Sequence, residues 1–286
     1  MPQVTGRTRV VGLFGWPVEH SLSPQIHNAG YKALNLDFIY VPFPVVPSEL
    51  SYGMQAVRAL NVAGVNVTSP HKEEVLKYLD KLTDTAAYLR AVNTIVNQGG
   101  HLVGHNTDAP GYLEALGQIL SPAEIAKGSA LILGGGGAAR AAAAGLCLGE
   151  TKRVVFAIRA PEKLSDWVKV VQETHPLVNV EVVHLGGNAF KACVRDSSIV
   201  INALPSAAAD AVSADWFKGL SLATRGTLFS DLRYSPPKTP FLDMGKSRGM
   251  QVQNGLPMLL EQGLLSFALF TGHIPPREAM EMAVEL

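Results

Sequence analysis

The chain has 286 residues, of which 47% are hydrophobic, so it can bury a sizeable core in one large domain or two ordinary ones. Lys and Arg together number 24, and so do Asp and Glu. This balance argues against nucleic acid or an anionic membrane surface as the main partner, and a small molecule is the expected one.

The two cysteines, Cys147 and Cys193, lie far apart in mainly apolar stretches and form no C-x-x-C pair. Two buried thiols in a reducing compartment are therefore expected, rather than a disulfide framework. No N-terminal segment has the basic start and apolar run of a signal peptide, and the apolar stretch 256–270 is interrupted by Glu261 and Gln262. These features predict a cytoplasmic protein that does not span a membrane.

The eight histidines give no strong metal-ligand spacing, since none belongs to an H-E-x-x-H motif. His101 and His105 could share one face of a strand, but no acidic or sulfur-bearing residue flanks them closely enough to complete a site. We therefore expect no metal.

Short β-branched runs alternate with longer amphipathic stretches, which is typical of an α/β protein with mostly parallel sheets. The expected strands are residues 9–15, 37–44, 62–67, 130–133, 153–158, 180–185, 199–203 and 227–232. The expected helices include residues 24–34, 73–82, 110–120, 139–148 and 256–270.

Residues 94–97 and 101–105 are separated by a Gln-Gly-Gly turn, which predicts a β-hairpin. After this hairpin the pattern becomes helical and then starts a new strand at 130–133. We therefore place a domain boundary near residue 109.

A glycine-rich turn from Gly134 to Arg140 follows the expected strand 130–133 and contains the pattern G-x-G-x-x-A. Between a strand and a helix this pattern is typical of dinucleotide binding. Gly134 would make the turn, Gly136 would admit the diphosphate, and Ala139 would let the helix approach the strand. A glycine-rich turn without a ligand is the alternative, which the strand-turn-helix context disfavours.

The next strand, 153–158, is followed by Arg159. An enzyme that uses NAD normally has an acidic residue there to hold the ribose hydroxyls, whereas a guanidinium can pair with a 2′-phosphate. Arg159 therefore favours NADP, although a solvated arginine at the end of a strand is the alternative.

Two serines stand at the start of the first expected helix. Ser23 suits the N-cap position and Pro24 the first helical position, and capping alone explains both. Ser21 is not explained in this way. Two hydroxyls at a helix N-terminus can also bind a carboxylate, because free backbone donors point there.

Lys72 follows an apolar strand and falls in the first turn of the expected helix 73–82, where the helix dipole disfavours an ammonium. Such a lysine is suited to proton transfer, and Asp108, at the end of a separate strand, is its expected carboxylate partner. A solvated lysine facing Glu73 or Glu74 is the alternative.

Gln262 lies on an otherwise apolar stripe of the expected helix 256–270, four residues after Met258 and three before Leu265. A polar side chain on such a stripe needs hydrogen-bond partners. Backbone groups could supply them, or a bound ligand could.

Together these residues resemble the shikimate dehydrogenase family, and the resemblance covers nearly the whole chain in order. The matching stretches are Ser21-Leu22-Ser23-Pro24 with His27-Asn28, Asn66-Val67-Thr68-Ser69-Pro70-His71-Lys72, Ala91-Val92-Asn93-Thr94, Asn106-Thr107-Asp108, Gly134 to Arg140, Tyr234 with Thr239-Pro240, and Gly255-Leu256-Pro257-Met258 with Gln262. Several short matches in the right order are more specific than any one of them.

The resemblance implies an N-terminal α/β substrate domain, residues 1–108, which is completed by C-terminal helices at about 256–286. It also implies a C-terminal Rossmann NADP-binding domain, residues 109–255, with the active site in the interdomain cleft. The implied reaction is the reversible reduction of 3-dehydroshikimate to shikimate, on the way to chorismate and the aromatic amino acids. A monomer or a homodimer is expected.

The resemblance also implies roles for single residues. Lys72 and Asp108 would form the catalytic pair, without a metal. The implied substrate-binding residues are Ser21, Ser23, Asn66, Thr68, Asn93, Tyr234 and Gln262. The implied cofactor-binding residues are Gly134, Gly136, Gly137, Ala138, Ala139, Arg159, Gly255 and Met258.

The sequence departs from the family pattern mainly on the cofactor side. The usual Asn-Arg-Thr is Ile158-Arg159-Ala160, the usual Asn-Ala-Thr stretch is Asn-Ala-Leu-Pro-Ser at residues 202–206, and Arg90 replaces a common glycine. The substrate class is therefore better defined than the cofactor, and NAD stays an alternative to NADP.

Three other functions remain open. A quinate or quinate/shikimate dehydrogenase with relaxed cofactor use is the nearest. A non-catalytic NADP-binding sensor on the same fold would not need the pair of Lys72 and Asp108. A short-chain dehydrogenase would require a tyrosine-lysine pair in the cofactor domain, and none is placed for it.

Overall fold

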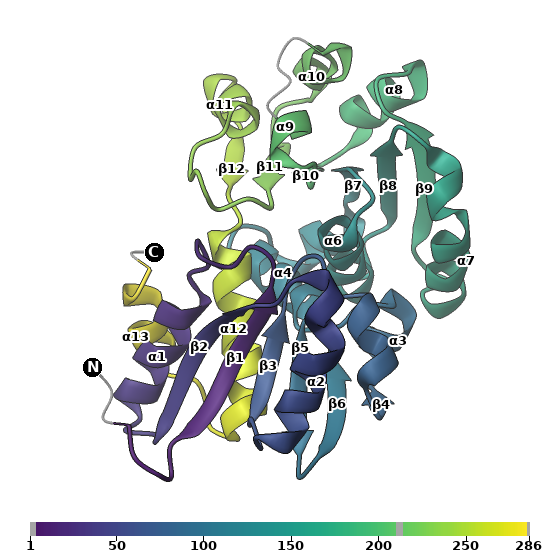
Figure 1. Cartoon of the computed structure of the whole chain (residues 1–286). Coiled ribbons are helices and arrows are strands. Elements are labelled where there is room, and N and C mark those ends of the chain that lie inside the picture. The colour runs from purple at the N-terminus through teal and green to yellow at the C-terminus, as the bar shows by residue number, and fades with distance from the viewer. Residues whose placement is uncertain (1–3, 210–213, 285–286) are drawn as a thin grey trace. The chain divides into compact units, whose positions relative to one another are not determined.

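The computed structural model describes residues 4–209 and 214–284. The chain divides into two compact units, Met1–Gly111 with Leu259–Leu286, and Tyr112–Met258. The first unit is discontinuous in sequence, because its last helices come from the C-terminal end of the chain (Figure 1).

The first unit contains a six-stranded sheet in the order β2-β1-β3-β5-β6-β4. β2, β1 and β3 run parallel, whereas β5 is antiparallel to both β3 and β6. The strands are β1 (Arg9–Gly15), β2 (Phe38–Pro44), β3 (Gly64–Val67), β4 (Lys81–Leu82), β5 (Thr94–Gln98) and β6 (His101–His105). The helices, with η for a 3-10 helix, are α1 (Ser23–Ala33), η1 (Pro47–Glu49), α2 (Leu50–Ala59), η2 (Glu74–Tyr78), α3 (Asp84–Leu89), most of α12 (Leu256–Thr271), and α13 (Arg277–Met282).

Helices cover both faces of this sheet, and the alternating side chains of β1 explain why. Val11 and Leu13 point into an apolar cluster formed with α1, α12 and α13, whereas Phe14 points into a second cluster formed with α2. Successive side chains of a strand face opposite sides, so a strand buried on both sides needs apolar residues at nearly every position. β1 meets this requirement after its first two residues.

The second unit contains a six-stranded parallel sheet in the order β12-β11-β10-β7-β8-β9. Read from β9 and numbered within the unit, this is the order 3-2-1-4-5-6 of the dinucleotide-binding Rossmann fold. The strands are β7 (Ser129–Leu133), β8 (Arg153–Ile158), β9 (Asn179–His184), β10 (Ile199–Asn202), β11 (Leu228–Asp231) and β12 (Gln251–Gln253). The helices are most of α4 (Asp108–Gly117), α5 (Pro122–Lys127), α6 (Gly137–Leu148), η3 (Pro161–Leu164), α7 (Ser165–Thr174), α8 (Asn188–Asp196), α9 (Ser206–Ala209), α10 (Asp215–Gly219), η4 (Leu220–Leu222) and α11 (Pro240–Ser247).

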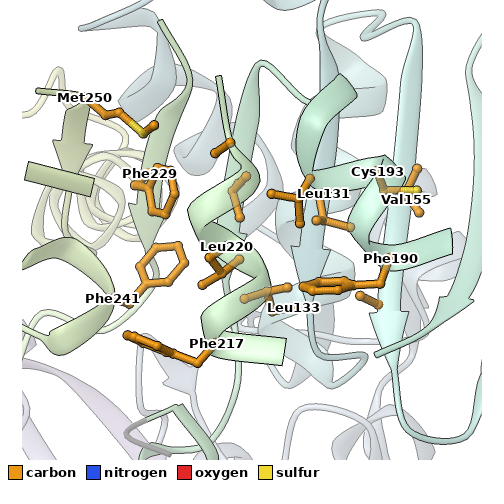
Figure 2. Close-up of a cluster of buried hydrophobic side chains, with 14 of the residues drawn as sticks. Leu131, Leu133, Val155, Phe190, Cys193, Phe217, Leu220, Phe229, Phe241 and Met250 are labelled. Atoms are coloured by element: carbon orange, nitrogen blue, oxygen red, sulfur yellow. The ribbon is translucent and has the colours of Figure 1, made fainter. Parts of the chain in front are cut away.

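An apolar cluster on one face of this second sheet joins the strands to α8, α10 and α11 (Figure 2). The rings of Phe229 in β11 and Phe241 in α11 are tilted against each other with their centroids 5.0 Å apart. Both side chains are fully buried. Replacing either phenylalanine by alanine should lower the free energy of unfolding by about 3–5 kcal/mol. This core therefore contributes strongly to holding β11 and α11 together.

The expected α/β class, the hairpin of β5 and β6 and the eight expected strands are confirmed, with ends that shift by at most two residues. The expected helix 73–82 is wrong, because the chain forms only the short η2 and then the strand β4. Asp80 explains the break, since its amide donates to Leu102 O and its carboxylate accepts from Leu102 N. This pairing with the hairpin outweighs the helical pattern.

The sixteen-residue helix α12 carries Glu261 and Gln262 within its apolar sequence. Within residues 4–209 and 214–284, no helix combines the length and the apolar character needed to cross a membrane.

Candidate active site

The polar residues of the first unit gather at one edge of its sheet. β3 and β6 are both antiparallel to β5, so their carboxyl ends lie at the edge where β5 begins. Lys72 follows β3, Asp108 follows β6, and Asn93 immediately precedes β5. The topology of the sheet therefore brings together side chains from three separate segments.

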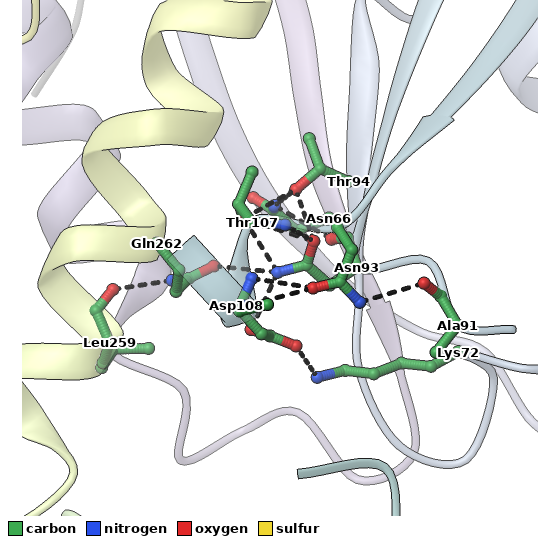
Figure 3. Close-up of polar contacts among 11 residues, drawn as sticks. Asn66, Lys72, Ala91, Asn93, Thr94, Thr107, Asp108, Leu259 and Gln262 are labelled. Carbon is green, nitrogen blue, oxygen red and sulfur yellow. Dashed lines mark hydrogen bonds and ion pairs between the residues drawn. The ribbon is translucent and has the colours of Figure 1, made fainter. Parts of the chain in front are cut away.

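Lys72 and Asp108 form an ion pair at this edge (Figure 3). Lys72 Nζ lies 2.6 Å from Asp108 Oδ2, and the two side chains are 23% and 10% exposed. Asp108 is the first residue of α4, where the positive end of the helix dipole favours a carboxylate. An ammonium has three N–H donors, so Lys72 keeps donors for a ligand after it has bound Asp108.

Lys72 itself lies in a turn before η2, so its expected place in the first turn of an α-helix is wrong. Neighbouring contacts hold this turn. Lys72 O accepts from Val92 N at 2.9 Å, and the buried His71 places its Nε2 2.6 Å from Val45 O. The position of Lys72 therefore depends on packing against other segments and not on a helix dipole.

Asn93 binds the second oxygen of the Asp108 carboxylate. Asn93 Nδ2 lies 2.8 Å from Asp108 Oδ1, and Asn93 Oδ1 accepts from Thr107 N at 2.7 Å. Asn93 is 2% exposed, so this connection is shielded from water. The carboxylate of Asp108 is consequently held from both sides, by Lys72 on Oδ2 and by Asn93 on Oδ1.

Asn106 caps the helix that Asp108 begins. Asn106 Oδ1 accepts from the amides of Asp108 and Ala109 at 3.1 and 3.2 Å, and its Nδ2 donates to Ala91 O at 3.0 Å. Sequence reasoning gave Asn106 no role. An asparagine two residues before a helical pattern is an N-terminal signal, so the capping role could have been found.

Asn66, in β3, joins the same network. Its Nδ2 donates to Asn93 O at 3.1 Å and to Thr94 Oγ1 at 3.0 Å, and the residue is 5% exposed. Thr94 and Thr107, whose hydroxyls lie 3.2 Å apart, complete the network and were also missed. No local sequence signal marks them, because most of their partners come from other segments of the chain.

Gln262 lies next to this network on α12. Its Oε1 is 3.4 Å from Asn93 Nδ2, and its Nε2 donates to Leu259 O at 2.7 Å (Figure 3). Gly111 in α4 packs on this point of α12, since an added Cβ would lie only 2.7 Å from Gln262 N. The backbone partner that the sequence offered as one alternative is thus present, and Gln262 also contacts the polar network through Asn93.

Ser21, Ser23 and Thr68 lie in segments that follow β1 and β3. The helix α1 begins at Ser23 itself with Leu22 as its N-cap, so the expected capping role of Ser23 is wrong. Ser21 Oγ accepts from Ser23 N instead, at 3.3 Å. Thr68 is half-buried, and its amide donates to Phe14 O at 2.8 Å. Within the described residues, no hydrogen bond links the side chain of Ser21 or Thr68 directly to the network of Figure 3.

In the second unit, the glycine-rich turn connects β7 to α6. Gly134 has φ +109°, a conformation that favours glycine, and an added Cβ would lie 2.9 Å from Ala203 O. Gly136 and Gly137 face open space, because a Cβ on either would meet nothing within 4 Å. Ala139 is fully buried.

This turn fits the diphosphate of a dinucleotide. α6 begins at Gly137, its N-cap Gly136 provides no side-chain hydrogen bond, and backbone N–H groups at such a start can bind an anion. The absence of side chains at Gly136 and Gly137 leaves room for close approach. Ala138 is exposed in the same turn, and Arg159 directly follows β8 and is exposed.

The remaining expected residues of this unit are Tyr234, Gly255 and Met258. Tyr234 lies after β11 and is half-buried, and Met258 lies in the first turn of α12. Gly255 packs on the backbone of Leu232, whose carbonyl oxygen an added Cβ would overlap. Close packing therefore already requires a glycine at position 255, whether or not a cofactor lies near it.

A buried carboxylate holds the segment that carries Tyr234. Asp231, at the end of β11, is fully buried and accepts from Asn202 Nδ2 at 3.1 Å and from Thr239 Oγ1 at 2.8 Å. Arg233 Nη2 lies 3.2 Å from the same oxygen. Residues 232–239 are thus tied at both ends to Asp231.

The two units combine a Rossmann sheet that has a glycine-rich turn after its first strand with a separate α/β unit that carries a lysine-aspartate pair. This combination defines a dinucleotide-dependent oxidoreductase. A family model described as the shikimate dehydrogenase substrate binding domain matches residues 13–95, and one described as the shikimate 5′-dehydrogenase C-terminal domain matches residues 255–285.

Relatives match over nearly the full length. The shikimate dehydrogenase (NADP(+)) of Desulforamulus reducens is 40% identical, over 97% of this chain and 95% of its own, and that of Citrifermentans bemidjiense is 41% identical, over 98% and 96%. A crystal structure of shikimate 5-dehydrogenase from Listeria monocytogenes in complex with shikimate and NAD superposes with a TM-score of 0.88 at 30% identity, covering 99% of this chain and 98% of that one. The chain belongs to the shikimate dehydrogenase family.

Proposed function

We propose that the chain catalyses the reversible, NADPH-dependent reduction of 3-dehydroshikimate to shikimate. The observation that carries this proposal is the contact of 2.6 Å between Lys72 Nζ and Asp108 Oδ2, set among amide and hydroxyl groups in the first unit. Family membership supports the reaction class, since the relatives are named for it.

The bound nicotinamide would supply the hydride, and the chain would supply the geometry and the proton. Charge builds on the carbonyl oxygen of the substrate during reduction, and an N–H donor of Lys72 can stabilise that oxygen and give it a proton. Asp108 Oδ2 holds Lys72 Nζ in place, and Asn93 fixes the carboxylate through Oδ1. In the reverse direction the same pair would receive the hydroxyl proton.

The substrate would be held mainly by residues of the first unit. Ser21 and Ser23 would bind its carboxylate, Asn66, Thr68, Asn93 and Gln262 its ring hydroxyls, and Tyr234 would line the site. Because Asn93 already uses its amide protons on Thr107 and Asp108, we assign it the positioning of Asp108 as well as any contact with the substrate.

The cofactor would lie on the glycine-rich turn of the second unit, with Gly134, Gly136, Gly137, Ala138 and Ala139 at its diphosphate. Arg159 would bind the 2′-phosphate of NADP. Gly255 and Met258 would complete the cofactor site. Use of NAD stays an alternative, because Ile158 and Ala160 offer no side-chain hydrogen bonds beside Arg159.

The location and assembly of the protein stay predictions, namely a cytoplasmic monomer or homodimer. The assignment of residues 1–108 and 256–286 to the substrate and of 109–255 to the cofactor is part of the same proposal. Quinate as a substrate and a non-catalytic sensor are the rival functions.

A substrate-cofactor matrix tests the proposal. Purified protein is assayed with shikimate or quinate, each with NADP or NAD, while the nicotinamide absorbance is followed. We expect the highest kcat/KM for shikimate with NADP. A preference for quinate would replace the substrate, and dinucleotide binding without turnover of either acid would favour the sensor.

A further inference from the structure

His27 and Asn28 belong to the stretches that resemble the family, yet neither has a role in the site described above. Both lie on α1, and both contact Tyr40 of β2. Asn28 Nδ2 donates to Tyr40 O at 3.0 Å, and Asn28 Oδ1 accepts from Tyr40 N at 2.9 Å. The His27 ring stacks on the Tyr40 ring with the centroids 4.4 Å apart and the planes 12° apart. Both the backbone and the ring of Tyr40 are therefore fixed by α1.

The hydroxyl of Tyr40 binds a residue expected to bind the substrate. Tyr40 Oη donates to Asn66 Oδ1 at 2.9 Å. Tyr40 is 2% exposed, and burial raises the pKa of its hydroxyl well above the ordinary value, although the nearby side chain of Ser23 lowers it in part. The hydroxyl therefore keeps its proton and donates it to Asn66.

Only a long side chain can make this connection. β2 and β3 lie on opposite sides of β1, where Tyr40 pairs with Val11 and Asn66 pairs with Leu13. Two strand spacings separate them, about 9–10 Å. Tyr40 and Asn66 point to the same face of the sheet, and the aromatic ring of Tyr40 crosses β1 to reach the amide. A shorter polar residue at position 40 would leave the Asn66 oxygen without this partner.

With the bond from Tyr40, the side-chain amide of Asn66 uses all but one of its hydrogen-bonding positions within the protein. An asparagine amide has two N–H donors and two acceptor sites. Both donors are used, on Asn93 O and Thr94 Oγ1, and Tyr40 occupies one acceptor site. The one group that Asn66 keeps for a ligand is an acceptor, which suits a substrate hydroxyl that donates.

We propose that Tyr40 is a positioning residue of the substrate site, which fixes Asn66 and so presents Asn66 Oδ1 as an acceptor for a substrate hydroxyl. This inference rests on the proposed function. It gives His27 and Asn28 a purpose, because they hold Tyr40. Tyr40 acts through Asn66 and is not a catalytic residue.

Tyr40→Phe is the test, and Tyr31→Phe is its matched control. Tyr31 belongs to the same apolar cluster and is also 2% exposed, but within residues 4–209 and 214–284 its hydroxyl has no hydrogen-bond partner. Both variants remove one buried hydroxyl and keep the ring. We expect Tyr40→Phe to raise the KM for shikimate about tenfold, the equivalent of one hydrogen bond, with kcat and the KM for NADP within about twofold. Tyr31→Phe should leave all three constants within about twofold of wild type.

A double-mutant cycle separates positioning from general loosening of the core. Because Tyr40 acts through Asn66, the KM effect of Tyr40→Phe should be smaller in an Asn66→Ala background than in wild type. Equal effects in both backgrounds, or equal shikimate KM values for Tyr40→Phe and Tyr31→Phe, would overturn the positioning role.

Asn28→Ala serves as a second variant if Tyr40→Phe does not fold. It frees the backbone of Tyr40 but leaves the hydroxyl, and a rise of about two- to fivefold in the KM for shikimate is expected. An unchanged KM in this variant would also count against the proposal. Absence of turnover in the wild-type protein would instead remove the proposed function, so the two failures are distinguishable.

Discussion

Asn106 Oδ1 accepts a hydrogen bond from the amide of Asp108, so the residue that caps α4 also holds the residue that carries the carboxylate. The same asparagine holds Ala91 O, which lies two residues before Asn93. The side chain of Asn106 thus holds both the backbone of Asp108 and the segment that leads to Asn93. Disturbing Asn106 should therefore affect both the stability of the fold and the geometry of the ion pair of Lys72 and Asp108.

Asn106→Ala should lower the free energy of unfolding by about 1–2 kcal/mol, because it removes a helix cap. It should also lower kcat about tenfold or more, since Asp108 loses its fixed position. Ser121→Ala is the matched control, because Ser121 caps α5 away from this network. Thermal unfolding and steady-state assays should show a stability loss in both variants and a loss of kcat in Asn106→Ala alone.

Lys72→Ala should lower kcat by about a hundred- to ten-thousand-fold, which is the usual contribution of a positioned proton donor. The KM for shikimate should change much less, because the lysine acts on charge that develops during the reaction. Lys77→Ala, which removes an exposed lysine of η2, should have no effect on either constant. Turnover at the wild-type rate in Lys72→Ala would remove this residue from the mechanism.

Arg159→Gln should weaken NADP more than NAD. Hydrogen bonds to a charged group contribute about 1.5–3 kcal/mol, so the KM for NADP should rise roughly 10- to 100-fold while that for NAD stays nearly constant. Lys152→Gln is the control, since this exposed lysine precedes β8 at the opposite end of the strand. Parallel changes for the two cofactors would show that Arg159 does not contact the 2′-phosphate.

Two glycine substitutions should separate packing from cofactor binding. Gly255→Ala should destabilise the protein strongly, because the added Cβ overlaps the carbonyl of Leu232. Gly137→Ala has room for its methyl group and lies at the start of α6, so stability should be unchanged or rise by about 0.5–1 kcal/mol. The KM for NADP should nevertheless increase in Gly137→Ala. Denaturant unfolding and kinetics measure the two effects separately.

Acid should destabilise the protein through His27. Burial lowers the pKa of His27 to about 3, whereas a histidine in an unfolded chain titrates near pH 6.5. Between these values the unfolded state binds more protons than the folded state, so the free energy of unfolding falls as the pH is lowered from about 6.5 toward 3. Urea unfolding at several pH values should show a shallower fall in His27→Phe than in wild type.

Most of the fold could be predicted because its signals are local. β1, β7 and β8 are continuous apolar runs, Gly99 and Gly100 carry the positive φ values that the hairpin needs, and the glycine pattern stands directly between β7 and α6. η2 and β4 could not be predicted, because the sequence 73–82 is amphipathic and only its pairing with Leu102 turns it into a strand. The short β12 was missed because three residues provide no usable period.

The site was less accessible to sequence reasoning. A lysine near a helix start and an aspartate after a strand are common, and only the antiparallel course of β5 brings Lys72 and Asp108 to one edge. Asp108 was one candidate partner of Lys72 beside Glu73 and Glu74, and the resemblance to a family gave the pair its catalytic role. The sequence around Tyr40, by contrast, indicates only an ordinary aromatic residue of the core. Its hydrogen bond to Asn66 could not be predicted without knowing that β2 and β3 both pair with β1.

The discontinuity of the first unit has a consequence for synthesis on the ribosome. The apolar cluster around β1 needs Leu260, Phe267, Phe270 and Met280, which are made after residues 112–258. The second unit, Tyr112–Met258, is complete before them. We therefore expect the second unit to fold first during translation, in contrast to the usual N-terminal-first order, and the apolar face of β1 to stay uncovered, and open to a chaperone, until these residues have been made.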